Sequence, residues 1–527
     1  MRAAIAVLLA LVATGCGGGA SDSGPGPTTP PVVTPPATRP VLPPTYRPTG
    51  RGAAGDVMVH LFEWRWTDIA TECEQVLGPA GYAAVQVSPP QEHLVNTGRE
   101  WWIRYQPVTY SIERSRSGTR AEFLDMVTRC RRAGVGIIVD AVINHMTGVQ
   151  SGTGSAGTTF TKYNYPGTWG PADFRSPPCG VSNYQDAANV QDCELLGLAE
   201  LNTSLASVRE RLAEYLAGLA RLGVAGFRID AAKHMQPVEL DGVINRMNAI
   251  LTGEGRPLPY VFHEVIDYGG EAVRASDYLG VGYASGSGSD ITEFKVRGIG
   301  DKFNNRGTQR VGELAQFSQT AWGLVPSDKA VVFLENHDTA RDPGIGNPSY
   351  RSPARWRLAT IWLLGQDYGY PSVLSGYAFD IGTMAGRDQG PPSDGAGNTL
   401  PVTCPPRLED ATGSGWVCEH RDPAIRAMIA FRRAVAGAPS TRPWEDGANA
   451  VAWSRGDRGF VLVNANPASL TATIPTGLPA GSYCDVLTGG RSGSGCAGLV
   501  VVVRADGTVQ PTLPERTALA IHLGTRL

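Results

Sequence analysis

Hydrophobic and polar positions divide this chain into segments of two kinds. From about residue 56 onward, short apolar runs of strand length alternate with longer stretches of helical spacing. This alternation is typical of parallel strands joined by crossover helices. Eight apolar runs are present, at residues 57–64, 83–90, 136–145, 226–230, 260–264, 291–295, 330–338 and 369–375. Eight such strands predict an α/β protein with a closed (β/α)8 barrel.

The pattern changes after about residue 439. Alternating or apolar runs follow there, separated by Gly, Pro and Asn, at residues 451–455, 459–465, 469–474, 498–504 and 517–523. They predict an antiparallel C-terminal β-sandwich. Residues 147–204, in contrast, are rich in Gly and Thr and form too long a stretch for an ordinary loop.

The amino terminus has the pattern of an export signal. Met1 and Arg2 precede an apolar stretch, Ala3 to Ala13, that is too short to span a bilayer as a helix. Residues 1–16 end on LVATGC, which looks like a bacterial lipoprotein signal with Cys16 as the lipidated residue. A soluble secreted protein, cut nearby, is the alternative. Residues 17–52 are rich in Gly, Ser, Thr and Pro and predict an extended spacer.

Acidic residues stand at or near the ends of three predicted barrel strands: Asp230, Glu264 and Asp338. A barrel delivers such side chains into a shared mouth at the C-terminal ends of its strands, where active sites lie. Two carboxylates that face each other across a sugar can break a glycosidic bond, one as proton donor and one as nucleophile or base. The sequence therefore predicts a glycosidase.

Each acid could instead be an ordinary strand-end residue that faces solvent. Against this, each lies in a polar cluster that packing alone does not require, and burial of such groups is costly unless they are paired or used. The clusters are Arg228, Asp230, Lys233 and His234; His263, Glu264 and Asp267; and Asn336, His337 and Asp338.

Charge and cysteine content limit the binding partners and the kind of site that the sequence predicts. The formal net charge of −3 argues against nucleic acid as a partner, because binding nucleic acid needs a basic face. Of the 9 cysteines, all but Cys16 form an even set in a chain that is predicted to be exported, so disulfides are expected. Sequence alone does not fix their pairing. A metal–thiolate site is less favoured, because no C-x-x-C spacing occurs.

Several long motifs, in order over about nine tenths of the chain, resemble the α-amylases, a retaining glycoside hydrolase family that acts on α-1,4-glucans. The resemblance is greatest to the animal-type α-amylases. The motifs are HLFEWRW at 60–66, VQVSPP at 85–90, WWIRYQPVTY at 101–110, VDAVINHM at 139–146, GFRIDAAKHM at 226–235, HEVID at 263–267, ENHD at 335–338, VCEHR at 417–421 and LPAGSYCDV at 478–486.

The resemblance implies an architecture. The barrel (a TIM barrel) would comprise residues 53–146 and 205–438, an irregular domain B residues 147–204, and the C-terminal β domain residues 439–527. It also implies a disulfide pairing: Cys73 with Cys130, Cys179 with Cys193, Cys404 with Cys418, and Cys484 with Cys496.

By resemblance, Asp230 is the nucleophile, Glu264 the general acid and base, and Asp338 the acid that stabilises the charged transition state. Chemistry supports these roles. Retention needs two carboxyls about 5 Å apart, and the donor must keep its proton near neutral pH, where a free glutamic acid of pKa about 4.3 loses it. Arg228 lies two positions before Asp230 on one strand, so it shares a face with Asp230 and would keep it ionised.

Sugar binding is assigned to a wider set of residues by the same resemblance. The histidines would hydrogen-bond sugar hydroxyls, and the aromatic rings beside the polar motifs would suit stacking on sugars. A histidine at a strand end can instead be structural. The set comprises Trp101, Trp102, Tyr105, Gln106, His145, Arg228, Lys233, His234 and His337.

The family also binds a structural calcium ion between the barrel and domain B. Calcium prefers several hard oxygen ligands. Asn144 would contribute its side chain, Gln191 and His234 their backbone carbonyls, and Glu200 its carboxylate, where relatives carry Asp. A longer carboxylate can still reach calcium, but the ion would then be held less tightly or by a neighbour such as Asp192.

A chloride ion near the acid/base is a further implication. In animal-type enzymes the Arg and Asn that match Arg228 and Asn336 hold it, together with a basic residue on the segment after ENHD. A gap-free match places Ala354 at that third position, with Arg355 next to it. The basic ligand is therefore either shifted or missing. We expect chloride to bind, with Arg355 as the candidate third ligand.

The implied activity is endo-acting hydrolysis of α-1,4-glucosidic bonds in starch, glycogen and malto-oligosaccharides by a monomeric enzyme. The predicted location is extracellular, or lipid-anchored at the bacterial cell surface. Two alternatives remain. The same carboxylates could transfer glucan chains, or the chain could be an inactive surface glucan-binding protein, although all three acids are present.

Overall fold

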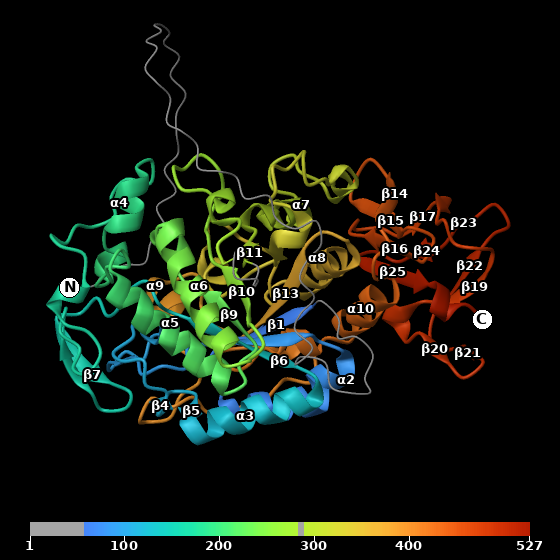
Figure 1. Ribbon diagram of the computed structural model, residues 1–527. Helices are drawn as coiled ribbons and strands as arrows, with labels where there is room; N and C mark the ends of the chain where they lie inside the picture. Colours follow the sequence, from blue (N-terminus) through green and yellow to red (C-terminus); the bar gives the residue numbers. More distant parts are fainter. Residues whose placement is uncertain (1–56, 283–288) are drawn as a thin grey trace, which may run out of the picture.

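The computed structural model describes residues 57–282 and 289–527 (Figure 1). The predicted export signal, the lipidation of Cys16 and the spacer lie outside the described residues. Within those ranges the chain forms a barrel, a segment that protrudes beside it, and a set of antiparallel strands at the C-terminal end, coloured red in Figure 1.

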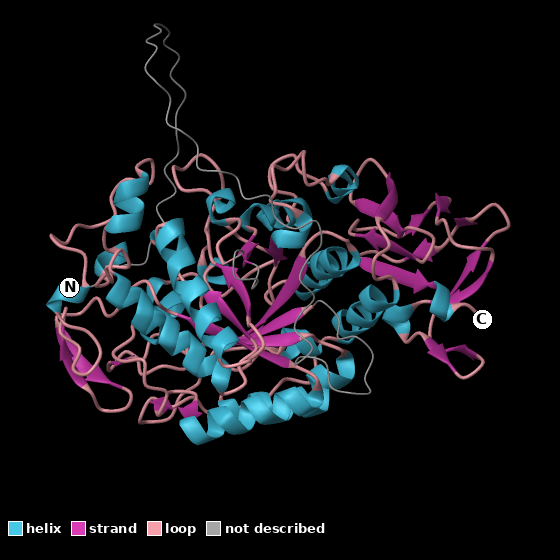
Figure 2. Cartoon of the chain, in the orientation of Figure 1, coloured by secondary structure: helices cyan, strands magenta, loops and turns pink. Residues whose placement is uncertain are grey.

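Eight parallel strands form the closed barrel that the sequence predicts, and they converge at the centre of Figure 2. Each strand lies in one of the predicted apolar runs or overlaps it. β1 closes the barrel, because it pairs with both β2 and β13. The strands are β1 (Met58–Leu61), β2 (Ala84–Val87), β6 (Gly136–Ala141), β9 (Gly226–Ile229), β10 (Tyr260–His263), β11 (Ser289–Thr292), β12 (Ala330–Val332) and β13 (Tyr370–Ser375).

The interior of the barrel has an apolar layer and a polar layer. The apolar layer is a buried cluster of Met58, Ala84, Ile138, Tyr260, Phe262 and Val331. Side chains two positions apart on a strand point to the same face. Two positions after members of this cluster stand His60, Gln86 and Asp140, all buried, and Arg228 is buried on β9. Polar side chains therefore fill the barrel just below the C-terminal ends of its strands.

Helices surround the barrel and bury an apolar stripe. In α5, Val208, Leu212, Leu216 and Leu219 are buried at intervals of three or four residues. No helix within the described ranges is long and apolar enough to cross a membrane. The helices are α1 (Trp66–Glu72), α2 (Gly78–Ala80), α3 (Arg120–Ala133), α4 (Ala187–Asp192), α5 (Ala206–Arg221), α6 (Pro237–Gly253), α7 (Gly298–Phe303), α8 (Pro353–Gly365), α9 (Met384–Asp388) and α10 (Pro423–Ala434).

Between β6 and α5 the chain leaves the barrel and forms the protruding segment, at the left of Figure 1. Its regular structure is short and consists of β7 (Ser151–Gly154), β8 (Thr159–Thr161) and α4. β7 also pairs with β3 (Leu94–Val95), which comes from the loop after β2. This irregular segment occupies the place where the resemblance implies domain B.

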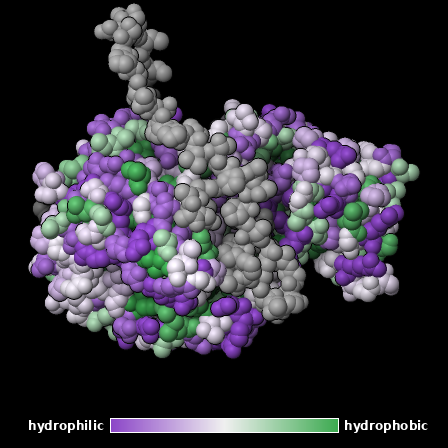
Figure 3. Space-filling view, viewed as in Figure 1, coloured by the Kyte–Doolittle hydropathy of each residue, from purple (hydrophilic) through white to green (hydrophobic). Residues whose placement is uncertain are grey.

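The C-terminal part contains a four-stranded antiparallel sheet in the order β14–β15–β16–β25. Short ladders, β17–β24, β18–β23 and β19–β22, share with it a separate apolar core. The short strands are β17 (Leu470–Thr471), β18 (Ile474–Pro475), β23 (Thr508–Val509) and β24 (Thr512–Leu513). On the face shown in Figure 3, hydrophilic and hydrophobic residues are interspersed over the surface. The main strands are β14 (Ser440–Glu445), β15 (Ala450–Arg455), β16 (Gly459–Asn464), β19 (Gly481–Cys484), β22 (Val500–Val503) and β25 (Thr517–His522). The predicted antiparallel domain is confirmed.

All eight cysteines of the described ranges are paired as the resemblance implies. The bonds are Cys73–Cys130, Cys179–Cys193, Cys404–Cys418 and Cys484–Cys496. The first joins the end of α1 to α3, and the second closes a loop in the protruding segment. Four disulfides fit a protein that is exported to an oxidising environment.

Candidate active site

Loops at the C-terminal ends of the barrel strands carry the predicted acids. Asp230 directly follows β9 and Glu264 directly follows β10. Their backbones continue the strand ladder, because the Asp230 N–H donates to the Ala141 carbonyl (3.0 Å) and the Glu264 N–H donates to the Ile229 carbonyl (2.9 Å). Asp338 lies further from its strand, on the loop after β12. Two of the acids are therefore held by the barrel itself and one by a loop.

Arg228 binds three carboxylates at once. It is the register partner of Asp140 across β6 and β9, and its Nη1 donates to that carboxylate. Nη1 also donates to Asp230 (2.9 Å), and Nη2 donates to Glu264. The other Glu264 oxygen accepts a hydrogen bond from the Ala231 N–H (2.9 Å). The planar fork of guanidinium donors thus fixes Asp230 and Glu264 relative to each other.

These three carboxylates share one positive charge. Burial raises the pKa of Asp230 well above its ordinary value, while Arg228 opposes the rise and Glu264 adds to it. Burial also raises the pKa of Asp140, again opposed by Arg228. Asp230 and Asp140 therefore keep a proton to a higher pH than free carboxyls would. The sequence suggested that Arg228 keeps Asp230 ionised, but three carboxylates share its charge.

Asp338 has fewer contacts than the other two acids. Its side chain is 36% exposed, and its Oδ2 lies 3.4 Å from His337 Nε2. The surrounding loops still desolvate the carboxyl, which raises the pKa of Asp338 to about 7; Glu264 adds to the rise, and Arg228 and Arg341 oppose it. The position of Asp338 therefore depends mainly on the fold of its loop.

The histidines near the acids are uncharged at neutral pH. Burial lowers the pKa of His145 and of His234 to about 4, and it holds the pKa values of His60 and His337 well below the ordinary value. The His337 ring stacks on Tyr105, with centroids 5.0 Å apart and an interplanar angle of 7°. A neutral imidazole offers one donor and one acceptor, and these histidines can therefore bind hydroxyl groups without adding charge.

Four predicted binding residues gather beside Asp338. The short helix η3 (Trp101–Tyr105) brings Trp101 edge-on to His337, with ring centroids 5.5 Å apart. The Tyr105 hydroxyl donates to Asp140 (3.0 Å), and its carbonyl oxygen lies 3.0 Å from His145 Nε2. Tyr105 thus links this group to the acid cluster.

The other predicted binding residues lie at the edges of the site. Lys233 pairs with Glu271 and donates to a backbone carbonyl (2.6 Å). The His234 ring lies 2.8 Å from a carbonyl oxygen of α4, and the Gln106 side chain accepts a hydrogen bond from the protruding segment (2.9 Å). Trp102 is half-buried.

Sequence analysis missed three polar residues of the cluster. Asp140 is fully buried, and its Oδ2 accepts a hydrogen bond from Gln86 (3.2 Å), whose Nε2 in turn lies 3.4 Å from His60 Nε2. The signal for Asp140 was a carboxylate inside an apolar strand, which is costly unless a cation meets it. His60 lies in the HLFEWRW motif and Gln86 in the VQVSPP motif, but the sequence assigned neither residue a function.

Comparison with known proteins decides the family. Residues 85–256 match the model described as alpha amylase, catalytic domain, and residues 444–524 match alpha amylase, C-terminal all-beta domain. An α-amylase of Oryzias latipes is 40% identical over 496 residues, covering 89% of this chain and 95% of the relative. A pancreatic α-amylase of Sus scrofa is 41% identical over 497 residues, with the same coverage. The chain belongs to the α-amylase family.

A solved α-amylase has the same fold. The structure of α-amylase I from Eisenia fetida is 37% identical, has a TM-score of 0.81, and covers 89% of this chain and 97% of its own. A second structure holds a variant of that enzyme in complex with maltohexaose. The resemblance, the fold class and the predicted class of enzyme, a glycoside hydrolase, are confirmed.

Animal α-amylases as a family bind calcium, and this α-amylase has residues that fit it. Glu200 is 2% exposed and its Oε2 has no hydrogen-bond partner, a costly arrangement unless a cation lies there. A backbone bridge joins Glu200 to His145, the residue after Asn144, and the Leu201 N–H donates to the Asn144 carbonyl (3.0 Å). With the Asn144 amide and the carbonyls of Gln191 and His234, the set offers the hard oxygens that calcium prefers.

Asp192, the alternative carboxylate, is already engaged. Its Oδ1 accepts a hydrogen bond from Gln236 (2.9 Å) and lies 3.1 Å from Arg175 Nη2. Among residues 57–282 and 289–527, no group of three His, Cys, Asp or Glu side chains could hold a metal alone. Carbonyl and amide oxygens would therefore complete a calcium site around Glu200.

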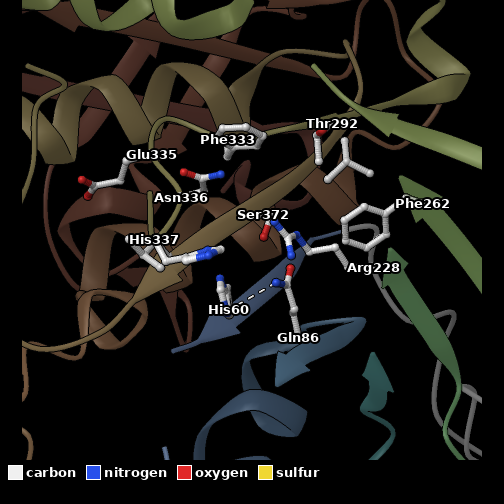
Figure 4. A pocket seen from close by; sticks show the side chains of 12 residues that line it. His60, Gln86, Arg228, Phe262, Thr292, Phe333, Glu335, Asn336, His337 and Ser372 are labelled. Atoms are coloured by element: carbon white, nitrogen blue, oxygen red, sulfur yellow. Dashed lines mark hydrogen bonds between the residues drawn. The ribbon is translucent and has the colours of Figure 1, made fainter. Parts of the chain in front are cut away.

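Chloride is the other ion of the animal α-amylases, and its predicted ligands meet at a small cavity of about 20 Å³ (Figure 4). Arg228 and Asn336 both line it. The remaining lining residues are His60, Gln86, Phe262, Thr292, Val331, Phe333, Glu335, His337, Ser372 and Leu374. Of all these residues only Arg228 carries a permanent positive charge, and three carboxylates already share that charge. Glu335 also lines the cavity, but its carboxyl points away from the other lining side chains in Figure 4.

The expectation that Arg355 supplies the third chloride ligand is wrong. Arg355 lies in the first turn of α8, on the outside of the barrel, and its side chain is exposed. The residue that β13 contributes to the cavity is the uncharged Ser372. Because a buried anion needs compensating positive charge, the residues of this cavity do not fit chloride.

Proposed function

We propose that this α-amylase is an endo-acting hydrolase of α-1,4-glucosidic bonds in starch, glycogen and malto-oligosaccharides, with retention of configuration. The observation that carries the proposal is the binding of Asp230 and Glu264 to one buried guanidinium at the mouth of the barrel. Retaining glycosidases need two carboxyl groups close together, one to attack and one to protonate. The maltohexaose complex of the Eisenia fetida enzyme supports the choice of substrate.

In the first step, Asp230 attacks the anomeric carbon while Glu264 gives a proton to the leaving glycosidic oxygen. The bond to the leaving sugar breaks as the bond to the Asp230 oxygen forms. In the second step, Glu264 takes a proton from water, the water oxygen attacks the same carbon, and Asp230 leaves as a carboxylate. Arg228 binds both carboxylates and favours the ionised form of Asp230 that the attack requires. Asp338 stabilises the positive charge that develops on the sugar.

Sugar hydroxyls would meet uncharged partners. His145 and His337 are neutral and can donate or accept, and Trp101 and Tyr105 supply ring surface beside Asp338. Lys233 and His234 would contact sugars at the opposite edge, near α4. Calcium would be held by Asn144, Gln191, Glu200 and His234, and it would stabilise the junction of barrel and protruding segment.

We propose that the protein is exported and acts as a monomer. Lipid attachment at Cys16 stays a prediction. Transfer of glucan chains uses the same carboxylates, because water and a sugar hydroxyl compete for one covalent intermediate. Incubation with soluble starch and analysis of the products over time separates hydrolysis, which accumulates short saccharides, from transfer, which lengthens some chains.

The first prediction concerns the two carboxylates. Asp230→Asn and Glu264→Gln should each lower the rate of starch hydrolysis by about three orders of magnitude or more, because one removes the nucleophile and the other the proton donor. The rate of release of reducing ends measures this. Glu210→Gln, an exposed acid on α5, is the control and should keep the wild-type rate. A rate of starch hydrolysis within tenfold of the wild-type rate, in either active-site variant, would overturn the assignment.

The second prediction concerns calcium. A bound ion stabilises only the folded state, so a chelator should lower the Tm of the wild type and added calcium should restore it. Glu200→Gln removes the unpaired carboxylate and should reduce the calcium-dependent difference in Tm, whereas Glu210→Gln should not. Differential scanning fluorimetry measures each difference. A Glu200→Gln protein with the full wild-type response to calcium would rule out Glu200 as a ligand.

The third prediction is that activity does not depend on chloride. The enzyme is dialysed into chloride-free buffer, and activity is recorded against pH as sodium chloride is returned, with sodium acetate of equal ionic strength as control. The rate and the basic limb of the pH–activity profile should be the same in both salts, because the cavity beside Arg228 lacks a second cation. A rise in rate with chloride alone would contradict this reading of the cavity.

A further inference from the structure

Arg341 lies next to the loop that carries Asp338. It ends the short helix η12 (Thr339–Arg341) and is 7% exposed. Its Nη1 donates to the His337 carbonyl (2.7 Å), and its Nη2 donates to the Tyr377 hydroxyl (2.9 Å). One guanidinium thus connects the loop after β12 to the segment after β13.

Four aromatic rings surround this guanidinium and form an aromatic wall, Phe62, Trp101, Tyr377 and Phe379. The guanidinium carbon of Arg341 lies 4.4 Å from the ring centroid of Phe379, 5.0 Å from that of Phe62, 5.1 Å from that of Trp101 and 5.3 Å from that of Tyr377. The rings come from the end of β1, from η3 and from the segment after β13. A cation over aromatic faces is attracted to them, and more strongly when water is excluded.

The same wall holds His337. The Phe62 ring stacks on His337, with centroids 5.0 Å apart, and on Tyr377, with centroids 6.0 Å apart. On the other side of the turn, Asn336 Oδ1 accepts hydrogen bonds from the N–H groups of Asp338 (3.1 Å) and Thr339 (2.8 Å). Among the residues that the structure describes, His337 is the one whose side chain lies close to the Asp338 carboxylate, so the position of Asp338 follows from how this turn is anchored.

The charge of Arg341 is not cancelled locally. No ion pair joins it to a carboxylate within the described ranges, unlike Arg228 with its three acids. Its positive charge lowers the pKa of Asp338, against the larger effects of burial and of Glu264. The other groups that act electrostatically with Asp338 are Arg228, Asp140, His337, Tyr105 and Tyr268.

We propose that Arg341 is a positioning residue of this enzyme, which clamps the turn of His337 and Asp338 against the aromatic wall and places an uncancelled positive charge beside the Asp338 carboxylate. The inference rests on the proposed function, in which Asp338 stabilises the transition state. Arg341 acts through Asp338 and not on the sugar, so its loss should affect turnover more than binding.

Arg341→Met and Arg341→Lys separate geometry from charge. The assay measures kcat and KM for maltoheptaose, the pH profile of kcat/KM, and Tm. Arg341→Met loses the charge and both hydrogen bonds, so kcat should fall by about tenfold or more, with KM within about threefold. Loss of the positive charge raises the pKa of Asp338, so less of it is ionised at a given pH and the acidic limb should move to higher pH. Arg341→Lys should return the acidic limb to its wild-type position, with kcat still below wild type.

Arg351→Met is the matched control. Arg351 also stacks on Phe379 (4.3 Å) and donates to its carbonyl (2.7 Å), but it does not contact the turn of Asp338. Its loss should leave kcat and the acidic limb unchanged, even if Tm falls. Tyr377→Phe removes the hydroxyl that accepts from Arg341 and donates to the Gln389 carbonyl (2.8 Å), and it should lower kcat without moving the acidic limb.

Three results would overturn the inference: an Arg341→Met enzyme with wild-type kcat and acidic limb, the same displaced limb in Arg341→Lys, or the same changes in Arg351→Met. If Arg341→Met does not fold, Arg341→Lys and Tyr377→Phe still test the proposal. A wild-type kcat in both variants would refute the positioning role of Arg341. A wild-type enzyme that leaves maltoheptaose intact would instead refute the proposed function.

Discussion

Burial of the Arg228 guanidinium inside the barrel is the constraint on which the active site depends. A buried cation must be met by carboxylates, and removal of one partner from a buried ion pair costs about 3–5 kcal/mol, a large share of the stability of a typical domain. Asp140, Asp230 and Glu264 meet this requirement from three neighbouring strands. The carboxylates needed for chemistry therefore also balance the buried cation.

The same charge balance explains what surrounds the cluster. One positive charge faces three acids, so a proton stays in the cluster at a pH where isolated carboxyls would have lost it. The side chains beside Arg228 in the cavity include the neutral His60 and His337 and the uncharged Gln86 and Ser372. A further anion would add to an existing excess of negative charge. Burial is the larger cause of the retained proton, and the division of one positive charge among three acids accounts for the poor fit for chloride.

Sequence predicts those parts of this structure that are encoded locally. Each barrel strand is an apolar run bounded by polar residues, and Asp230 and Glu264 stand where such runs end, so their position at the mouth follows from the pattern. The role of Asp140 depends on its register with Arg228 across β6 and β9, which neither strand encodes alone. Counting positions along the chain misplaced the third chloride ligand at Arg355, because the path of the chain carries α8 outside the barrel while Ser372 on β13 faces the cavity.

The three acids differ in how they are held, and this difference shows where the enzyme is sensitive. Asp230 and Glu264 extend the backbone ladder of the barrel, so the fold itself fixes them. Asp338 stands on a loop without such a ladder, and side chains must restrain it: Asn336 from within the turn, and Arg341 with the aromatic wall from outside. Substitution of either side chain leaves these backbone hydrogen bonds in place. Substitutions in the clamp can disturb the third acid alone, because the barrel does not need the loop in order to close.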